Sequence, residues 1–248
     1  MKMLLRLALA AAVLAAVIGA AGCRSTTSNL DVQDNSAFIP TVRIAVDFNE
    51  RPGPPSHLHT SHAVEVGVTG ATGSDTMQLS AGQQPVVFGG ETFATPQDLK
   101  AQFDFRYTEV AYRYRYVSQR RGIGFEALAG AAYARLGLRL TGATRIAAEK
   151  LDGGGVVVGL GTMLRVWPSG SIQLRGSGFF SNTSEGVSSV GRYEINLEQA
   201  LGRHAAIRAG YAGYDIRSQR ENDGFSSSNR SPIRVRASGP TVGLMLMF

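Results

Sequence analysis

Residues 192–198, RYEINLE, decide the fold of this chain, because polar and apolar side chains alternate there without a break. In an extended strand, successive side chains point to opposite faces. One face then carries Tyr193, Ile195 and Leu197, and the other carries Arg192, Glu194, Asn196 and Glu198. A period of two predicts a β-strand and does not fit an amphipathic helix.

The same period recurs from residue 62 to the end of the chain. It predicts strands at 62–72, 99–117, 122–141, 154–167, 171–182, 190–201, 204–217 and 240–248. The stretch 126–140 is rich in Ala and Leu, which favour a helix, but two glycines interrupt it and its neighbours are strands, so we predict a strand. Apolar positions are odd from Phe103 to Tyr107 and even from Val110 to Tyr116, which predicts a β-bulge near residues 108–109.

The connections between these strands alternate in length. Those after the second, fourth and sixth strands are short: SQRR, PSG and GR. Those after the first, third, fifth and seventh are longer and polar: 73–98, 142–153, 183–189 and 218–239. Short turns on one side and long loops on the other are typical of outer-membrane β-barrels.

The N-terminus has the composition of an export signal. Lys2 and Arg6 precede an apolar run from Leu7 to Ile18, which is too short to span a bilayer. We predict a signal peptide at 1–22, a polar linker at 23–61 and a barrel at 62–248. Cys23, the only cysteine of the chain, follows small residues that resemble a bacterial lipobox, and this resemblance implies that Cys23 is acylated; the alternative is an ordinary signal peptide.

Many of the predicted strands carry a row of charged side chains on one face, and these charged rows indicate a membrane setting. A soluble sandwich would have to bury them at high cost, whereas in a closed barrel the apolar row faces lipid and Arg and Glu pair in the lumen. The sequence therefore predicts an all-β fold, a transmembrane antiparallel up-and-down β-barrel of eight strands. The predicted lumen charges are Glu65, Glu109, Arg113, Arg115, Glu126, Arg165, Arg175, Arg192, Glu194, Glu198 and Arg208. The predicted lipid-facing and interfacial tyrosines are Tyr107, Tyr112, Tyr114, Tyr116, Tyr133, Tyr193 and Tyr211.

Two further segments bear on the number of strands. TVRIAVDF at 41–48 alternates like a strand inside the predicted linker, and VVFGGETF within 70–97 is a candidate hairpin. If both join the barrel, it has ten strands.

The chain ends in an apolar segment, TVGLMLMF at 241–248. Thr241, Gly243, Leu246 and Phe248 match the order polar, glycine, apolar and aromatic that ends small outer-membrane barrels. The chain resembles the OmpA/OmpX-like and opacity-type barrels in this motif and in the strand pattern of 62–248. The resemblance implies that the barrel-assembly machinery binds this terminal strand during biogenesis, and that the protein lies in the cell outer membrane.

Other chemistry has weaker support in the sequence. His57, His59 and His62 are close together, but no carboxylate or cysteine accompanies them, so we predict no metal and no cofactor. A lipid A-modifying enzyme needs a His near its nucleophile, and the remaining His204 lies in a predicted short turn. A narrow pore remains an alternative, although lumen charges that pair with one another would close it. The net charge of +6 is spread singly along the strands and does not indicate nucleic-acid binding.

The sequence thus predicts a non-enzymatic, monomeric outer-membrane protein with a structural or surface-interaction role. Its expected partners are outer-membrane lipid and lipopolysaccharide, because loop 218–239 is basic and faces a leaflet rich in phosphate. The sequence does not identify a ligand or receptor for the loops.

Overall fold

The computed structural model describes residues 30–48, 58–81, 83, 85–118, 122–182, 186–202, 204–219 and 233–247, and these residues form an all-β structure without a helix. The strands are β1 (Leu30–Asp34), β2 (Ile39–Asp47), β3 (Leu58–Leu79), β4 (Val86–Phe88), β5 (Glu91–Phe93), β6 (Gln97–Ser118), β7 (Ile123–Thr141), β8 (Ile146–Trp167), β9 (Gly170–Phe180), β10 (Gly186–Ala200), β11 (Ala205–Gln219) and β12 (Ile233–Met247). The predicted all-β class is confirmed, and the Ala-rich stretch 126–140 lies within β7.

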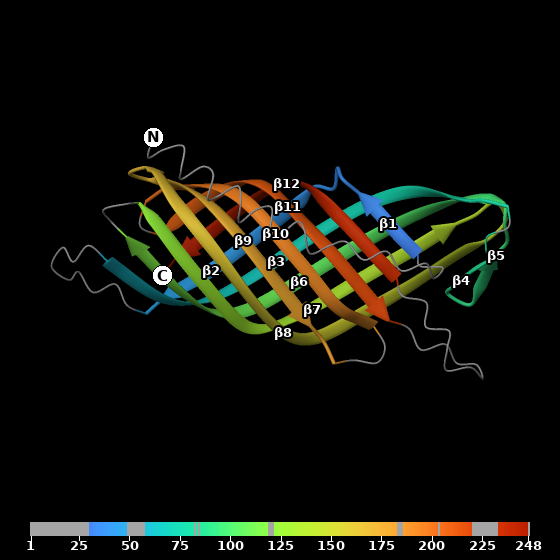
Figure 1. Ribbon diagram of the computed structural model, residues 1–248, viewed down its shortest axis with the longest axis horizontal. Helices are drawn as coiled ribbons and strands as arrows, with labels where there is room; N and C mark the ends of the chain where they lie inside the picture. Colours follow the sequence, from blue (N-terminus) through green and yellow to red (C-terminus); the bar gives the residue numbers. More distant parts are fainter. Residues whose placement is uncertain are drawn as a thin grey trace.

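The main sheet contains ten strands and runs in a closed circuit (Figure 1). Antiparallel pairing connects β2, β3, β6, β7, β8, β9, β10, β11 and β12 in that order, and β12 then pairs with β2 in parallel. This circuit has nine strands. Because strands of an up-and-down path alternate in direction, the first and the last of an odd number run in the same direction, so β2 and β12 pair in parallel. β1 pairs with β12 beside β2, also in parallel, and β4 and β5 form a separate two-stranded sheet.

The seam between β2 and β12 joins segments about 200 residues apart in the chain. The hydroxyl of Thr241 donates a hydrogen bond of 2.7 Å to the carbonyl of Ile39. Gly243 lies opposite Thr41, and a Cβ at residue 243 would come within 2.9 Å of the Thr41 carbonyl oxygen. Glycine therefore allows the two strands their close approach at this seam.

The predicted number of eight strands is not confirmed. β1 and β2 lie within 23–61, the predicted linker, and their pairing with β12 adds them to the sheet. The alternating segment 41–48 does belong to the sheet, whereas the candidate hairpin became β4 and β5, outside it. The tenth strand of the main sheet is therefore β1. The local sequence pattern did not predict β1, because its partner β12 lies at the other end of the chain.

The two ends of the ring differ in their connections. At the end where β6 begins, here called the loop end, the links include 80–96 and 220–232; at the other, the turn end, most links are short, such as 168–169. Figure 1 shows the hairpin β4–β5 at the loop end. The observed difference in length between the two sets of links is smaller than predicted. β8 begins at Ile146 and β10 at Gly186, so much of the predicted loops 142–153 and 183–189 is strand.

The interior changes in composition along the strands. Toward the loop end it holds an apolar core whose larger members are Leu99, Phe103, Phe105, Tyr107, Leu136, Leu138, Leu140, Phe179, Tyr214, Ile216 and Val235. Phe105 contacts the ring of Tyr214 at a centroid distance of 5.3 Å, and Tyr107 meets Phe179 edge to face at 6.1 Å. Aromatic pairs of this geometry stabilise a core beyond the area they bury.

The β-bulge predicted near residues 108–109 is wrong. β6 pairs with β3 and β7 without a shift of register, and its odd-numbered residues point inward along nearly the whole strand. The composition of the inward face changes instead, from Phe103, Phe105 and Tyr107 to Glu109 and Arg113. Tyr107, predicted to face lipid, is therefore a buried core residue with 2 % of its surface exposed.

Candidate functional site

The outer surface carries a belt of exposed apolar side chains over the half of the ring nearer the turn end. Every strand of the closed circuit contributes to this apolar belt. Its members are Val42, Ile44, Val46, Val66, Val68, Val110, Tyr112, Tyr114, Phe125, Tyr133, Val156, Val158, Leu160, Leu164, Val166, Ile172, Phe180, Tyr193, Ile195, Leu197, Ile207, Tyr211, Val242 and Leu244. An exposed apolar surface of this extent marks a surface that contacts other apolar matter.

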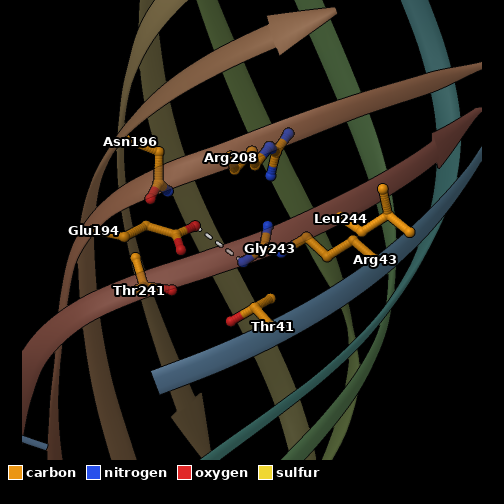
Figure 2. A pocket seen from close by; sticks show the side chains of 8 residues that line it. All are labelled: Thr41, Arg43, Glu194, Asn196, Arg208, Thr241, Gly243 and Leu244. Carbon is orange, nitrogen blue, oxygen red and sulfur yellow. Dashed lines mark hydrogen bonds and ion pairs between the residues drawn. The ribbon is translucent and has the colours of Figure 1, made fainter. Parts of the chain in front are cut away.

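Inside the belt, the ring is filled by an ion-pair network of arginine and glutamate side chains. Glu65 lies at its centre and accepts hydrogen bonds from Arg43 at 2.7 Å, Arg113 at 2.9 Å and Arg175 at 2.8 Å. Arg43 also donates to Glu194 at 2.9 Å, a contact visible in Figure 2. Arg43 and Glu65 come from neighbouring strands, whereas Glu194 comes from β10 on another part of the ring.

Further pairs extend the network around this centre. Arg175 also binds Glu126 at 2.6 Å, and Glu126 accepts a bond of 3.0 Å from Arg115. Arg192 lies between two carboxylates and donates to Glu109 at 3.0 Å and to Glu194 at 2.9 Å. Near the turn end, Arg208 donates to Glu198 at 2.6 Å and contacts the sulfur of Met245.

The network is close to neutral, because the arginines 43, 113, 115, 175, 192 and 208 meet the glutamates 65, 109, 126, 194 and 198. Burying charges is costly, and the cost is offset only where the geometry is good and most lone pairs and protons are used. Several members serve more than one partner, which meets this condition at Glu65, Arg43 and Arg175, whereas Glu109 Oε2 and Arg192 Nε are buried without a hydrogen-bond partner among the described residues. The arrangement can hold opposite walls of the ring together, and its side chains fill the space through which a solute would pass.

The structure places most predicted lumen charges inside the ring. Arg115 and Glu198 are the least buried, with side-chain exposures of 15 % and 14 %. Arg165 differs from the others: it continues the inward-facing phase of β8, but it is exposed at the end of that strand and makes no contact with the network. Arg43, one of the largest fully buried side chains, was missed. The alternation of residues 41–48 could have identified it, since Arg43 lies between the outward-facing Val42 and Ile44.

One small cavity lies beside the network, and its volume is about 10 Å³. Figure 2 shows its lining residues, Thr41, Arg43, Glu194, Asn196, Arg208, Thr241, Gly243 and Leu244. A space of this size holds about one water molecule. It is far smaller than the clefts of roughly 300 Å³ or more that bind drug-sized ligands.

The remaining predicted site residues lie apart from the network. Thr241 and Gly243 point inward at the seam with β2, and Leu246 is partly exposed; Cys23 and Phe248 lie outside the described residues. His62 contacts the hydroxyl of Tyr112 and meets the ring of Tyr114 edge on, whereas His57 is not among the described residues. Within the described ranges, no three potential metal ligands gather into a site.

Comparison with known proteins assigns no relative. No family model matches the chain, and neither a curated protein nor a solved structure matches it. In the part of the chain that the structure describes, no helix has the length and apolar composition to cross a membrane. The apolar belt, the ion-pair network and the closed strand circuit are the features of the chain that bear on its function.

Proposed function

We propose that this protein is an outer-membrane β-barrel with a structural or surface-interaction role and a sealed, charged lumen. The observation that carries the proposal is the inverted polarity of the half nearer the turn end. Charged side chains fill its interior, and apolar side chains cover its outer face on every strand of the circuit. In water this arrangement is unfavourable on both faces, whereas in lipid the apolar belt is solvated by acyl chains and the charges pair inside.

The height of the apolar belt supports this proposal. On β8 the outward apolar residues run from Val156 to Val166. At a rise of about 3.4 Å per residue they extend over roughly 34 Å along the strand, which corresponds to about 25 Å along the barrel axis for a tilt of about 45°. Transmembrane barrels have an apolar band of about this height.

The closed circuit supports it as well. A sheet edge in hydrocarbon would leave unpaired backbone groups, each costing several kcal/mol. Here the parallel pairing of β2 with β12 gives both terminal strands of the circuit a partner. The barrel that we propose therefore has nine strands in its wall, with β1 extending the seam toward the loop end, in place of the eight predicted from the sequence.

The filled lumen favours a structural role over a narrow pore or a lipid A-modifying enzyme. Ion pairs occupy the interior at the level of the belt, and the apolar core blocks it toward the loop end. Surface interactions, including those with lipopolysaccharide, then fall to the loop end and the outer wall. During biogenesis, the terminal strand with Thr241, Gly243, Leu246 and Phe248 is the segment that we expect the assembly machinery to bind.

The seam also restricts the proposed lipid anchor at Cys23. β1 joins the sheet at the loop end, and a fully extended chain from Cys23 to Leu30 spans at most about 25 Å. This is shorter than the roughly 40 Å thickness of a bilayer with its headgroups. If Cys23 is acylated, its lipid therefore lies in the leaflet at the loop end. Incorporation of labelled palmitate, compared with Cys23→Ser, tests the acylation.

The experiment for the proposed function uses the full chain refolded into phospholipid vesicles. We expect an unheated sample to migrate faster on a denaturing gel than a heated one, to resist extraction at high pH and to give no steady conductance across a planar bilayer. A chain that stays in solution without lipid as a folded monomer contradicts the membrane assignment. Stepwise channel conductance contradicts the sealed lumen, and an altered mass of lipid A in cells that overexpress the chain contradicts the non-enzymatic role.

A further inference from the structure

Above the apolar belt, on the side of the loop end, two arginines face each other across the strands β6 and β7. Arg106 and Arg135 are direct partners in the register of this antiparallel pair, and both side chains are exposed on the outer face. Directly opposite residues have Cβ atoms about 5 Å apart, and like charges in such positions are destabilising. The pair thus places two guanidinium groups side by side at an energetic cost.

The carboxylates near these arginines neutralise them poorly. The carboxylate Oδ2 of Asp104 is 3.6 Å from the guanidinium Nη2 of Arg106. Both side chains are largely exposed, Asp104 by 54 % and Arg106 by 71 %. Arg135 lies 5.8 Å from the centre of the Tyr133 ring and 3.5 Å from its hydroxyl, and among the described residues no carboxylate oxygen lies within 4.0 Å of it. Asp152, opposite Arg135 on β8, accepts a hydrogen bond from Tyr133 instead.

A second arginine pair on another part of the wall shares one carboxylate between its two members, and the first pair has no such shared carboxylate among the described residues. Arg217 of β11 and Arg234 of β12 are also direct partners. Between them lies Asp215, which accepts two hydrogen bonds from Arg234, at 2.5 Å and 2.8 Å, and one of 3.5 Å from Arg217. The chain therefore bridges one cross-strand arginine pair with a single carboxylate, whereas no carboxylate of the described residues bridges Arg106 and Arg135, and an external anion can take that bridging position.

The position of the unbridged pair indicates which anion it meets. Toward the turn end, the next outward-facing residues on the two strands are Thr108 and Tyr133, followed by Val110 and Ala131 of the belt region. If the belt lies in hydrocarbon, Arg106 and Arg135 lie at the level of the lipid headgroups. Guanidinium groups bind phosphate oxygens in a bidentate manner, and two of them can hold one phosphate between them. Lys100 and Arg139, farther along the same face, add positive charge around this position.

We propose that Arg106 and Arg135 form a binding site for the phosphate of a phosphorylated lipid in the leaflet at the loop end. The proposal rests on the proposed function, because only a bilayer around the belt brings headgroups to this height. The bound phosphate takes the bridging position that Asp215 occupies in the β11–β12 pair and that no described carboxylate occupies between Arg106 and Arg135. The apolar belt below the site receives the acyl chains of the same lipid.

The test measures lipid binding by the full chain in detergent micelles with native mass spectrometry. The probes are bisphosphorylated lipid A, the same lipid after removal of its phosphates, and inorganic phosphate. The test variant is Arg106→Gln with Arg135→Gln, and the matched control is Arg217→Gln with Arg234→Gln, which removes the same charge from the bridged pair. We expect the test variant to weaken lipid A binding by about tenfold for each arginine removed and the control to change it by less than twofold.

Three outcomes overturn the site: equal losses in both variants, no loss in the test variant, or equal binding of the lipid without phosphates. Displacement of the lipid by inorganic phosphate at similar concentration contradicts the choice of a lipid. A separate measurement distinguishes this failure from failure of the proposed function. If the wild-type chain inserts into vesicles and shows heat-modifiable mobility but does not bind lipid A, the site alone is wrong; if it does not insert, the proposed function is wrong and the site falls with it.

A stability measurement provides an independent readout. In micelles of an uncharged maltoside detergent, which contain no phosphate, Arg135→Gln removes a like-charge repulsion and should raise the urea midpoint of unfolding slightly. When lipid A is added, the order should reverse, because only the wild type gains stability from the bound phosphate. A merely structural arginine would shift the midpoint in the same direction under both conditions, and that result contradicts the site.

Discussion

The two halves of the ring differ in which face of a strand is apolar. In the half near the turn end the outward face is apolar, and in the half near the loop end the inward face is apolar. Near the turn end, β6 points Glu109 and Arg113 inward and Val110 and Tyr112 outward. Near the loop end, the same strand points aromatic residues inward and polar residues such as Arg106 outward. Its alternation never changes phase, so the difference lies in which side is apolar. The proposed function accounts for this difference with two surroundings, a membrane around the first half and water around the second.

The largest effect is expected from breaking the network in the half near the turn end. Glu65→Ala leaves Arg43, Arg113 and Arg175 without their shared carboxylate. Removing one partner of a buried pair typically costs about 3–5 kcal/mol, so we expect a loss of this size in the free energy of unfolding. Urea titration in phospholipid vesicles measures it. A loss below about 1 kcal/mol would show that water reaches the network and that the lumen is not sealed.

A core truncation near the loop end should cost a similar or slightly smaller amount for a different reason. Leu136→Ala removes a fully buried side chain from the apolar core. Large-to-small changes of this kind cost about 2–5 kcal/mol through lost burial and the cavity that remains. Unlike Glu65→Ala, this loss should not depend on salt concentration, because no charge is exposed. Equal salt dependence of the two variants would contradict the division of the interior into charged and apolar halves.

Arginine substitutions along one strand can locate the boundary between the two surroundings. Leu160 has 71 % of its surface exposed in the belt region of β8, and Ala148 is exposed on the same strand nearer the loop end. In a bilayer, Leu160→Arg should destabilise the folded chain by about 2–4 kcal/mol. Ala148→Arg is the matched control and should change the stability by less than about 0.5 kcal/mol. If both substitutions are equally harmless in vesicles, the belt does not face lipid.

The smallest effect concerns the exposed wall near the loop end. Partial burial opposes the ionisation of Asp215, but the hydrogen bonds and charges of Arg234 and Arg217 outweigh it and hold the pKa of this carboxyl below its ordinary value. Because the pKa is lower in the folded chain than in the unfolded one, the stabilisation is fully present above about pH 4 and is lost as the pH falls through the folded pKa.

We therefore expect Asp215→Asn to lower the temperature of the gel-mobility transition at pH 7, by an amount that shrinks toward zero in strong acid. The effect should be modest, since exposed ion pairs contribute little. An unchanged transition at pH 7, or a difference that grows in acid, would contradict this pairing. Asp104→Asn is the control. The contact of Asp104 with Arg106 is 3.6 Å long, longer than the contacts between Asp215 and Arg234, so its loss should have the smaller effect.

Sequence patterning predicted the existence of the long strands from β3 onward, because a period of two is a local property that survives in any surroundings. It placed the loop ends of β3, β8 and β12 about seven or eight residues too early or too late. It predicted most of the buried charges for the same reason: Glu194 alternates with apolar residues that must face the other way. The error at Tyr107 arose where an aromatic residue was assumed to face lipid. The phase of β6 is continuous there, and the alternation alone does not state which face is inside.

The missed parts of the site share one cause. Arg43 and the strands β1 and β2 belong to the N-terminal segment, and their role depends on pairing with β12 at the other end of the chain. A local pattern can predict a strand in residues 41–48, but it carries no information about a partner about 200 residues away. Arg165 illustrates the converse, since its alternation is correct but its place at the end of β8 leaves it exposed.

The sequence by itself determined that the chain is all-β, that its strands follow one another up and down, and that one face of many strands is charged. These properties depend on side-chain alternation and on turn residues, which act over a few residues. Only the tertiary structure decided the parallel closure, the ten strands of the main sheet and the division of the interior into an ion-pair network and an apolar core. Those features depend on which distant strands meet, because a side chain becomes interior only when the ring closes around it.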